Sequence, residues 1–293
     1  MKIEEFRKKL NEFSIEGVDS EECIYMLKSL PIGVLDKDFT KKIVSPDTLK
    51  ARLSELFVSM MFHRKKVENL TGKDDGPDVI FDFDSKKYNV EVVTPLEVEK
   101  QKGKFRVFSP NDSPSCEDGE IVDANSFKLR VSSVFKSKVK QFEKWINKGI
   151  VESVDVNIIC INIGFIDSLM LGDMDSLWRV FYNEQVVLIS GQDEENIYCE
   201  LYENPTSVNK KDKQLKQSYF NTEEIDCGNI DGVLLVNIKK PTSAEERSIF
   251  FESPSAKLNV GNIFKNDILN FIVHRHPDHY LLDQIRQNGK VRK

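Results

Sequence analysis

Two acidic residues, Asp78 and Glu91, stand where a carboxylate could do chemistry. Asp78 follows Gly76-Pro77 and opens an apolar, strand-like run, whereas Glu91 interrupts a run of valines that is typical of a buried strand. A buried carboxylate is costly unless it is paired or binds a metal. Carboxylate oxygens suit Mg²⁺, which keeps several waters and can activate water beside a phosphate oxygen. The two residues therefore indicate a magnesium site for phosphate chemistry.

The segments around these residues predict a hairpin that brings them together. Residues 78–83 and 88–93 are strand-like, and Asp84-Ser85-Lys86-Lys87 between them is typical of a turn. Because side chains alternate across a strand, pairing of the two runs lets Asp78 and Glu91 converge at one end of the sheet.

Helices and further strands complete the expected architecture. Ser45 is a helix cap, Pro46 suits the first helical position, and the Leu and Met stripe from Leu49 onward is typical of a core-facing helix. Residues 126–148 predict a second long helix that ends at Gly149. We also expect short helices in 1–40, strands in 66–70, 154–163, 185–189 and 232–238, loops in 96–125 and 203–216, and a last helix in 261–274. The order helix, strands, helix, buried strand predicts a three-layer α/β or α+β domain.

The carboxylate pattern resembles the PD-(D/E)xK nuclease superfamily, whose fold is called restriction-endonuclease-like. In that pattern an Asp after Pro begins one strand, and Glu-x-Lys lies on the next. This chain has Pro77-Asp78 and, 13 positions later, Glu91-Val92-Val93, so Val93 stands where the family has Lys. The resemblance covers roughly residues 45–163.

Two helices extend the resemblance. The family often has an assisting Glu on the helix before the strands, and Glu55 is the candidate here. The RecB-type branch adds Gln-x-x-x-Tyr on the following helix, where this chain has Gln141 and, in place of Tyr, Trp145. On a helical wheel Glu55 points away from the apolar stripe, so an ordinary solvated charge is its competing interpretation. Trp145 is favoured as a core residue.

The resemblance implies a reaction as well. Asp78, Glu91 and the main-chain carbonyl of Val92 would hold Mg²⁺ or Mn²⁺, and metal-activated water would hydrolyse a phosphodiester of DNA or RNA. The family's lysine orients that water or stabilises charge, which Val93 cannot do. Some members carry the lysine on the following helix, where the candidates are Lys138, Lys140 and Lys144, with Lys140 in our expected catalytic set.

The implied fold is a restriction-endonuclease-like three-layer α/β core, a mixed central sheet flanked by helices. We expect this core in residues 41–165, after an N-terminal helical segment in 1–40. Residues 166–293 form a C-terminal α/β extension that completes the same domain or makes a small second one.

The missing lysine also favours a second class of function. A catalytically inactive nucleic-acid-binding or protein-interaction module on the same fold would not need it. In such a module Asp78 would simply begin a strand after a Gly-Pro turn, and Glu91 would pair with a core-facing Lys or Arg.

The predicted helix 126–148 carries a stripe of like charge. Lys136, Lys140, Lys144 and Lys148 are four residues apart, and the nucleic-acid-binding candidates are Lys136, Lys138, Lys140 and Lys144. Such a face can follow a phosphate backbone, and like charges at this spacing are mildly destabilising without an anionic partner. The alternative interpretation is a solvated helix face.

Composition sets the outer limits. The chain has 293 residues and a net charge of -6, which excludes a global field that attracts nucleic acid but leaves room for a local basic face. Its five cysteines are widely spaced, with no Cys-x-x-Cys pair, which favours a reducing compartment. The sequence begins without a secretory signal and has no apolar run long enough to span a bilayer. We therefore expect a cytoplasmic protein without a membrane partner. A homo-oligomer is compatible with these features.

A competing metal motif lies near the C-terminus. The run from His274 through His276 to His279 matches H-x-H-x-D-H, which resembles the signature of metallo-β-lactamase-like hydrolases. That fold needs further His and Asp ligands well after the motif, but only 14 residues follow and none is His. A solvated polar helix end is the preferred interpretation, ahead of a local surface metal site.

Overall fold

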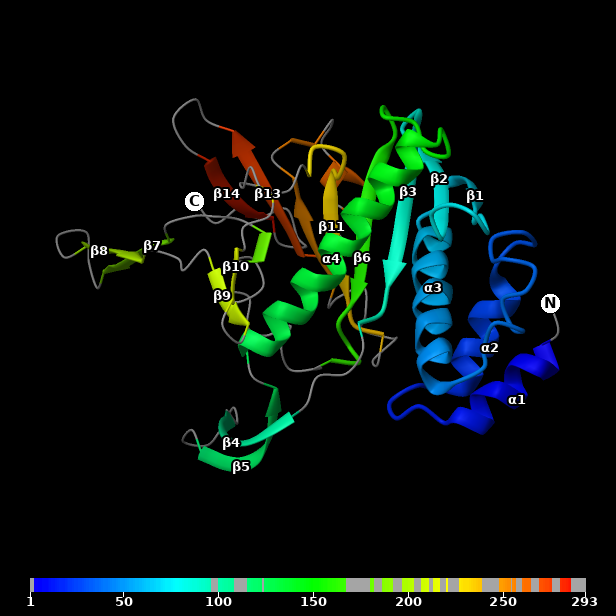
Figure 1. Cartoon of the computed structure of the whole chain (residues 1–293), viewed down its shortest axis with the longest axis horizontal. Coiled ribbons are helices and arrows are strands. Elements are labelled where there is room, and N and C mark those ends of the chain that lie inside the picture. The colour runs from blue at the N-terminus through cyan, green and yellow to red at the C-terminus, as the bar shows by residue number, and fades with distance from the viewer. Residues whose placement is uncertain are drawn as a thin grey trace.

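An eight-stranded mixed β-sheet forms the centre of the computed structural model (Figure 1). Across the sheet the strands follow the order β1 (Glu68–Thr71), β2 (Val79–Phe83), β3 (Lys86–Val93), β6 (Val156–Asn162), β11 (Gly232–Val236), β12 (Ile249–Glu252), β13 (Leu269–Arg275) and β14 (Tyr280–Ile285). β3, β6 and β11 run parallel to one another, as do β12 and β13, and the other neighbouring pairs are antiparallel. The expected α/β class with a mixed sheet is confirmed.

The described residues contain four α-helices: α1 (Ile3–Phe13), α2 (Ser20–Ser29), α3 (Pro46–Arg64) and α4 (Ala124–Asn147). A short 3₁₀ helix, η3 (Val260–Phe264), precedes β13. Three antiparallel pairs lie outside the main sheet: β4 (Lys100–Val107) with β5 (Ser115–Val122), β7 (Val186–Gly191) with β8 (Ile197–Tyr202), and β9 (Ser207–Lys210) with β10 (Lys213–Lys216). Among the helices described, none combines the length and the apolar character needed to cross a bilayer.

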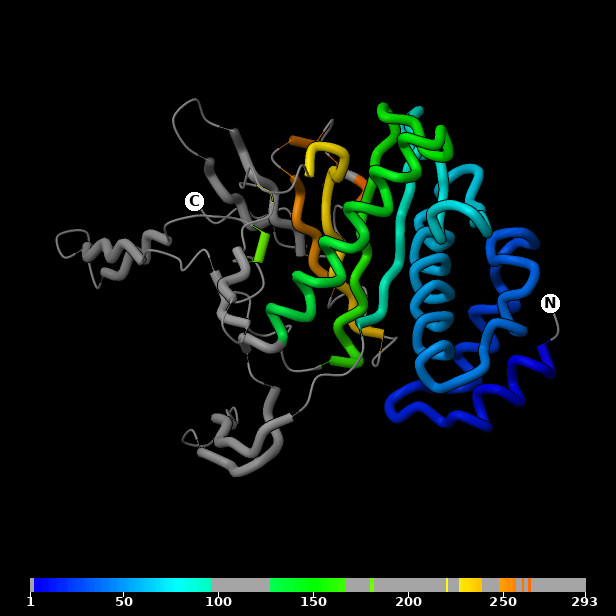
Figure 2. Tube along the Cα trace, viewed as in Figure 1, coloured from blue at the N-terminus to red at the C-terminus, as the bar shows by residue number. Residues whose placement is uncertain are grey.

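The structure describes the backbone of residues 3–95, 100–107, 115–122, 124–166, 180–181, 186–191, 197–202, 207–210, 213–216, 220, 227–238, 248–253, 255–256, 260–264, 269–275 and 280–285. Side chains are described in 3–95, 127–166, 180–181, 220, 227–238, 248–253, 255–256, 260 and 263–264, the part drawn in colour in Figure 2. This part includes six strands of the main sheet, from β1 to β12 in the order above.

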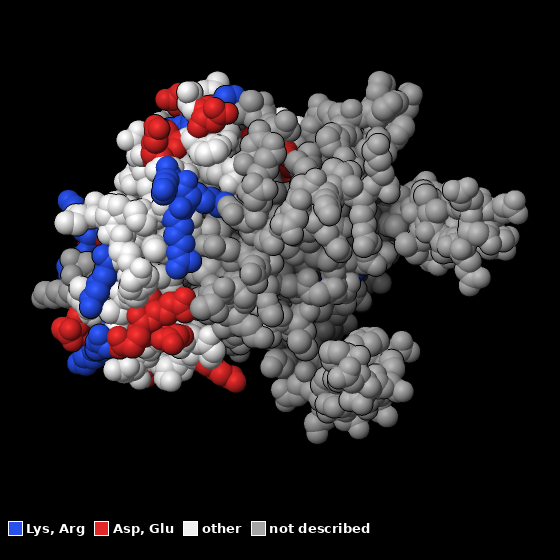
Figure 3. Space-filling view, turned by 180° about the vertical axis from the view of Figure 1, so that it is seen from behind, with Lys and Arg blue, Asp and Glu red and all other residues white. Residues whose placement is uncertain are grey.

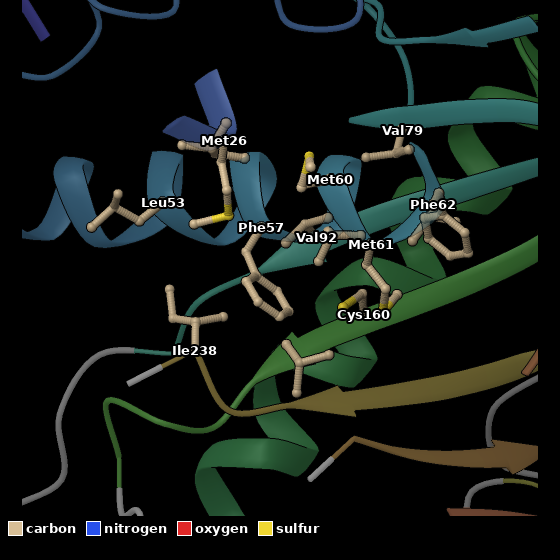
Figure 4. Close-up of a cluster of buried hydrophobic side chains, with 14 of the residues drawn as sticks. Met26, Leu53, Phe57, Met60, Met61, Phe62, Val79, Val92, Cys160 and Ile238 are labelled. Atoms are coloured by element: carbon tan, nitrogen blue, oxygen red, sulfur yellow. The ribbon is translucent and has the colours of Figure 1, made fainter. Parts of the chain in front are cut away.

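Two hydrophobic clusters cover the two faces of the sheet, and each involves different helices. One cluster joins α1, α2 and α3 to alternate strand residues such as Val92 and Cys160. Figure 4 shows Phe57 and Met61 of α3 facing these two strand residues. The other cluster joins α4 to the intervening residues, such as Ile159. Because successive strand side chains point to opposite faces, α3 and α4 lie on opposite sides of the sheet.

Local sequence signals explain where the elements near the predicted site begin and end. Ser45 Oγ accepts a hydrogen bond from the Thr48 N–H at 3.2 Å, and Thr48 Oγ1 accepts one from the Ser45 N–H at 2.8 Å, which caps α3. Asp84 and Ser85 connect β2 to β3 at φ 51° and 59°, as a two-residue hairpin turn requires. Gly149 ends α4 at φ 68°, in the left-handed region that glycine adopts freely.

A buried polar network fixes the alignment of β3 against β6. Asn89 Nδ2 donates hydrogen bonds to Asp155 Oδ2 at 3.0 Å and to Asn157 Oδ1 at 3.1 Å. The Asn157 N–H in turn donates to Asp231 Oδ2 at 2.8 Å, next to β11. These buried groups lose hydrogen bonds in any other register, so the network also sets the position of Glu91, two residues further along β3.

The predicted elements around the site are confirmed, whereas three predictions elsewhere are wrong. Residues 96–125 contain the β4–β5 pair, and residues 203–216 contain β9 and β10, where loops were expected. Polar strands of this kind satisfy their hydrogen bonds within a ribbon and leave no apolar signal in the sequence. The predicted helix in 261–274 is instead η3 followed by β13, because β12 and β14 offer pairing on both sides of a β-branched and aromatic segment.

Gly72 allows a close approach of backbones just before Asp78. A Cβ at this position would lie 2.7 Å from the Asp78 carbonyl oxygen and 2.8 Å from the Val34 carbonyl oxygen. Since neither atom can rotate away, we expect Gly72→Ala to lower the free energy of unfolding by about 1–3 kcal/mol, as measured by urea titration.

Gly76→Ala is the matched control in the same loop. Its added Cβ would meet the Lys73 Cβ at 3.3 Å and the Ile150 Cγ2 at 3.4 Å, contacts that need a displacement far smaller than those at Gly72. The control should change stability less than Gly72→Ala, and equal losses would contradict the assignment.

Candidate active site

The two carboxylates predicted from the sequence meet at one end of the sheet. β2 and β3 pair as far as Val79 opposite Val90. Asp78 and Glu91 are the next residues on each side, and their carboxyl groups form a hydrogen bond with each other. The hairpin therefore brings Asp78 and Glu91 side by side.

Asp78 is held by the main chain of the neighbouring strand. Its Oδ2 accepts a hydrogen bond from the Val92 N–H at 2.9 Å. Burial raises the pKa of Asp78, while the Val92 N–H and the Lys138 ammonium act in the opposite direction. The hydrogen bond fixes one carboxylate oxygen and thereby the direction in which the other can bind.

Glu91 has a cationic partner that comes from the helix on its face of the sheet. The residue is only 4% exposed, and its Oε1 lies 2.5 Å from Lys138 Nζ. Lys138 Nζ also donates to Gln141 Oε1 at 3.0 Å, so one turn of α4 presents an ammonium and an amide together. Glu91 Oε2 is buried, and the Glu91 and Asp78 carboxyl groups form a hydrogen bond with each other. Glu91 is thus held by Lys138 on one side and by Asp78 on the other.

Glu55 approaches the same carboxylates from α3. Its side chain is 14% exposed, and its Oε2 lies 2.5 Å from Arg52 Nη1. Arg52 Nη1 also lies 3.5 Å from Asp36 Oδ2, and its guanidinium carbon is 5.9 Å from the centre of the Phe39 ring. The solvated charge considered for Glu55 is therefore wrong, because the segment before α3 covers this face of the helix.

The buried carboxyl groups of this site have raised pKa values. Burial raises the pKa of Glu91 to about 8, and the negative charge of Asp78 adds to this rise. Burial also raises the pKa of Glu55 to about 8, with Asp78 again contributing and Arg52 opposing. Groups with such raised pKa values in one place bind a cation favourably, because it removes the repulsion between them.

The oxygen donors fit a divalent metal of the magnesium class. Asp78, Glu91 and the main-chain carbonyl of Val92 are hard ligands, and a cation could take the place of the proton that the hydrogen-bonded Glu91 and Asp78 carboxyl groups share. Within the part of the chain whose side chains are described, no group of three or more His, Cys, Asp or Glu is arranged to hold a metal. A metal here would therefore rely on two carboxylates and a main-chain oxygen.

The lysine that reaches this site is Lys138 rather than the expected Lys140. Lys140 is exposed, and two residues along a helix are separated by a rotation of about 200°, so the two side chains point in different directions. Val93 is half-buried at the end of β3. Trp145 is confirmed as a core residue, with its ring centre 5.3 Å from that of Phe142.

The remaining candidate residues are the other lysines in and after α4 and three histidines near the C-terminus. Lys140 and Lys144 are exposed on α4, Lys148 is exposed just after it, and Lys136 is half-buried. His274 lies in β13, where side chains are not described, and His276 and His279 lie outside the described residues. These placements separate Lys138, which faces Glu91, from the exposed lysines of the stripe.

Arg52 and Asp36 are residues of the site that sequence reasoning missed. Arg52 stands three positions before Glu55 on the same helix, a spacing that favours ion pairs and could have identified it. Asp36 lies 16 residues from Arg52 in a segment without regular periodicity, so no local pattern indicates it.

No protein-family model, curated protein or solved structure matches the chain. Its function therefore has to be inferred from the site itself, to which α3, α4 and the β2–β3 hairpin each contribute charged side chains.

The stability of the metal-free protein should depend on the protonation of Glu91. The folded protein holds this proton up to about pH 8, whereas an ordinary glutamate releases it near 4.5, so unfolding releases protons between these values. We expect the free energy of unfolding, measured by urea titration with a chelator present, to fall by about a few kcal/mol as pH rises across this window.

Glu91→Gln should make this dependence shallower, because the amide does not titrate, and should leave the part of the slope that comes from the raised pKa of Glu55. Glu68→Gln, an exposed position on β1, is the control and should keep the wild-type slope. An equally steep fall in Glu91→Gln would show that the slope has another origin.

Proposed function

We propose that this protein is a metal-dependent nuclease of the PD-(D/E)xK type that hydrolyses phosphodiester bonds of DNA or RNA. The observation that carries the proposal is the 2.5 Å contact between Lys138 Nζ and Glu91 Oε1, beside Asp78. The following helix thus supplies the ammonium that Val93 cannot. A purely structural ion pair would account for Glu91 and Lys138, as Arg52 does for Glu55, but it does not account for the Asp78 carboxyl group that is buried against Glu91.

The order of the elements supports a restriction-endonuclease-like core. α3 precedes the antiparallel strands β1, β2 and β3, and α4 then leads to β6, which pairs parallel to β3. This is a mixed sheet flanked by helices, as the family resemblance implies. The site lies at the end of the β2–β3 hairpin, where rigid strands hold its ligands.

Each side chain has a definite role in the proposed reaction. Asp78, Glu91 and the Val92 carbonyl would hold Mg²⁺ or Mn²⁺, which when bound neutralises phosphate charge and lowers the pKa of water. Lys138, which donates to Glu91 and Gln141, would place positive charge where the phosphate becomes more negative during hydrolysis. Gln141 positions Lys138.

Glu55 and Arg52 act from the α3 side. The Glu55 carboxylate raises the negative potential around Asp78, and Arg52 holds it in one orientation. These two residues assist the site without a direct role in bond breaking.

The exposed lysines of α4 provide a route for an anionic strand. Lys140 and Lys144 follow one another at single-turn spacing on the helix that carries Lys138, and Lys148 lies one residue after the helix ends. On the described part of the face seen from behind, acidic side chains at the top and bottom of the view lie next to basic ones, and a group of basic side chains lies between them (Figure 3). A local basic face in a protein of net charge -6 directs nucleic acid to one place and not to the whole surface.

Removal of a residue of the site should abolish cleavage while the fold survives. We expect Asp78→Asn, Glu91→Gln and Lys138→Met each to lower kcat by about 10²- to 10⁴-fold, with labelled single- and double-stranded DNA and RNA as substrates and Mg²⁺ or Mn²⁺ present. A chelator should have the same effect on the wild type.

Lys140→Met is the matched control, since it removes a lysine from the same helix on the exposed side. If it loses as much kcat as Lys138→Met, the assignment of the lysine fails. If the wild type binds nucleic acid in a salt-sensitive manner but cuts none of the four substrates, the inactive binding module replaces the nuclease.

The α4 lysines should control affinity rather than chemistry. In the inactive Asp78→Asn background, Lys140→Gln and Lys144→Gln should each weaken binding and reduce the slope of log affinity against log salt by about one. Fluorescence anisotropy measures both quantities. Lys28→Gln, an exposed position on α2, is the control, and an equal change in it would show a non-specific charge effect.

A further inference from the structure

The β9–β10 hairpin concentrates positive charge outside the carboxylate site. Its strand residues include three lysines, Lys210, Lys213 and Lys216, and no acidic residue. The β4–β5 pair differs in this respect, because its register sets Lys104 opposite Asp118. The β9 and β10 strands therefore carry a positive charge that they do not balance between themselves.

The pairing of β9 with β10 brings like charges to neighbouring positions. Lys210 stands directly opposite Lys213, whereas the next pair, Asn209 and Gln214, is uncharged. Like charges at directly opposed positions destabilise a strand pair, and a hairpin of two strands is only marginally stable by itself in water. An anion bound beside the two lysines would remove this repulsion.

The hairpin is supported by α4, the helix that brings Lys138 to Glu91. β9 lies against α4 (Figure 1). After β10 the chain returns to the same helix at Phe220, whose ring centre is 6.0 Å from that of Phe135. The Phe220 N–H also donates to the Phe181 carbonyl oxygen at 2.9 Å. Contacts with α4 thus hold the hairpin at β9 and again just after β10.

These contacts place the hairpin near the part of α4 that belongs to the carboxylate site. Lys216 stands four residues before Phe220, and four residues of chain span at most about 14 Å. Lys138 stands three residues after Phe135, which is about 4.5 Å along the helix axis. A nucleic acid bound at the hairpin would therefore reach the carboxylates within about one turn of a duplex, roughly 34 Å.

We infer that the β9–β10 hairpin is a second contact surface for nucleic acid, which binds the phosphate backbone beside the place of cleavage. This inference rests on the proposed nuclease function and adds β9 and β10 to its substrate-binding surface. Lysine binds phosphate as a point charge, and the Ser, Asn and Gln side chains of these strands are of the types that donate to phosphate oxygens. The hairpin would therefore recognise charge and not base sequence.

The test compares two triple variants that change the net charge of the protein equally. Both are made in the Asp78→Asn protein, so that no substrate is consumed. One replaces the three hairpin lysines by glutamine. The control replaces three exposed lysines of the N-terminal segment by glutamine, namely Lys8, Lys28 and Lys37. Fluorescence anisotropy measures the binding of labelled single- and double-stranded DNA and RNA over a range of salt concentrations.

The hairpin variant should lose salt dependence as well as affinity. Each lysine that leaves a phosphate lowers the slope of log affinity against log salt by about 0.7–0.9, so the slope should fall by about 2–3 on at least one of the four nucleic acids. The control should keep the slope of the parent protein, because its lysines lie on the N-terminal helices and in the segment that follows them.

A third variant separates charge from folding. Replacement of the three hairpin lysines by arginine keeps the charge and should keep the slope. A slope that falls no further in the glutamine variant than in the control overturns the inference, and the lysines would then only protect the strand edges from association. An equal loss in the arginine variant also overturns it, because the effect would not come from charge.

Cleavage by the wild type separates this inference from the proposal on which it rests. If the wild type cuts a substrate and the glutamine variant matches the control, the nuclease stands and the hairpin surface falls. If the wild type cuts none of the four nucleic acids but the glutamine variant loses slope, the nuclease falls and the hairpin surface stands. If the Asp78→Asn protein binds none of them, the hairpin surface is overturned as well.

Discussion

Burial of two facing carboxylates is the constraint on which the site depends. Glu91 lies in the buried part of β3, and the β2–β3 hairpin brings the Asp78 carboxyl group against it. Such a pair is unstable unless cations or protons compensate the charge. α4 brings Lys138 to Glu91, and α3 brings Arg52 to the neighbouring Glu55. The helix layers on both faces of the sheet therefore bury apolar surface and also make an acidic centre tolerable.

The frame around this centre is rigid for identifiable reasons. The Asn89 network fixes β3 against β6, and Ser54 joins α3 to the ends of both strands. The segment that precedes α3 contributes Asp36 to the ion pairs of Arg52, and Lys42 binds Asp36 in turn at 2.5 Å. The N-terminal helices thus pack against the core and also hold the charged residues behind the site, which preorganises it before any ligand binds.

More of this site can be predicted from the sequence than the Pro-Asp and Glu pattern alone indicates. The meeting of Asp78 and Glu91 follows from strand periodicity and a tight turn, which are local properties. The lysine that contacts Glu91 could also have been predicted. Lys138 stands between Phe135 and Phe142 at helical spacing and so borders the apolar stripe of α4. Lys140 lies on the opposite side of that helix and is exposed. The position of a lysine around the helix therefore predicts its contact with Glu91 better than its membership of a stripe of like charges.

Local chemistry in the chain accounts for the β2–β3 hairpin, the cap of α3, the end of α4 and the buried character of β6. These features depend on neighbours a few residues away, so turn geometry, capping and periodicity suffice to predict them. The ion pair of Lys138 with Glu91 joins residues 47 apart, and that of Arg52 with Asp36 joins residues 16 apart. The strand pairing of β13 likewise depends on distant partners. Only the packed tertiary structure decides such contacts, because they depend on how whole elements dock against one another.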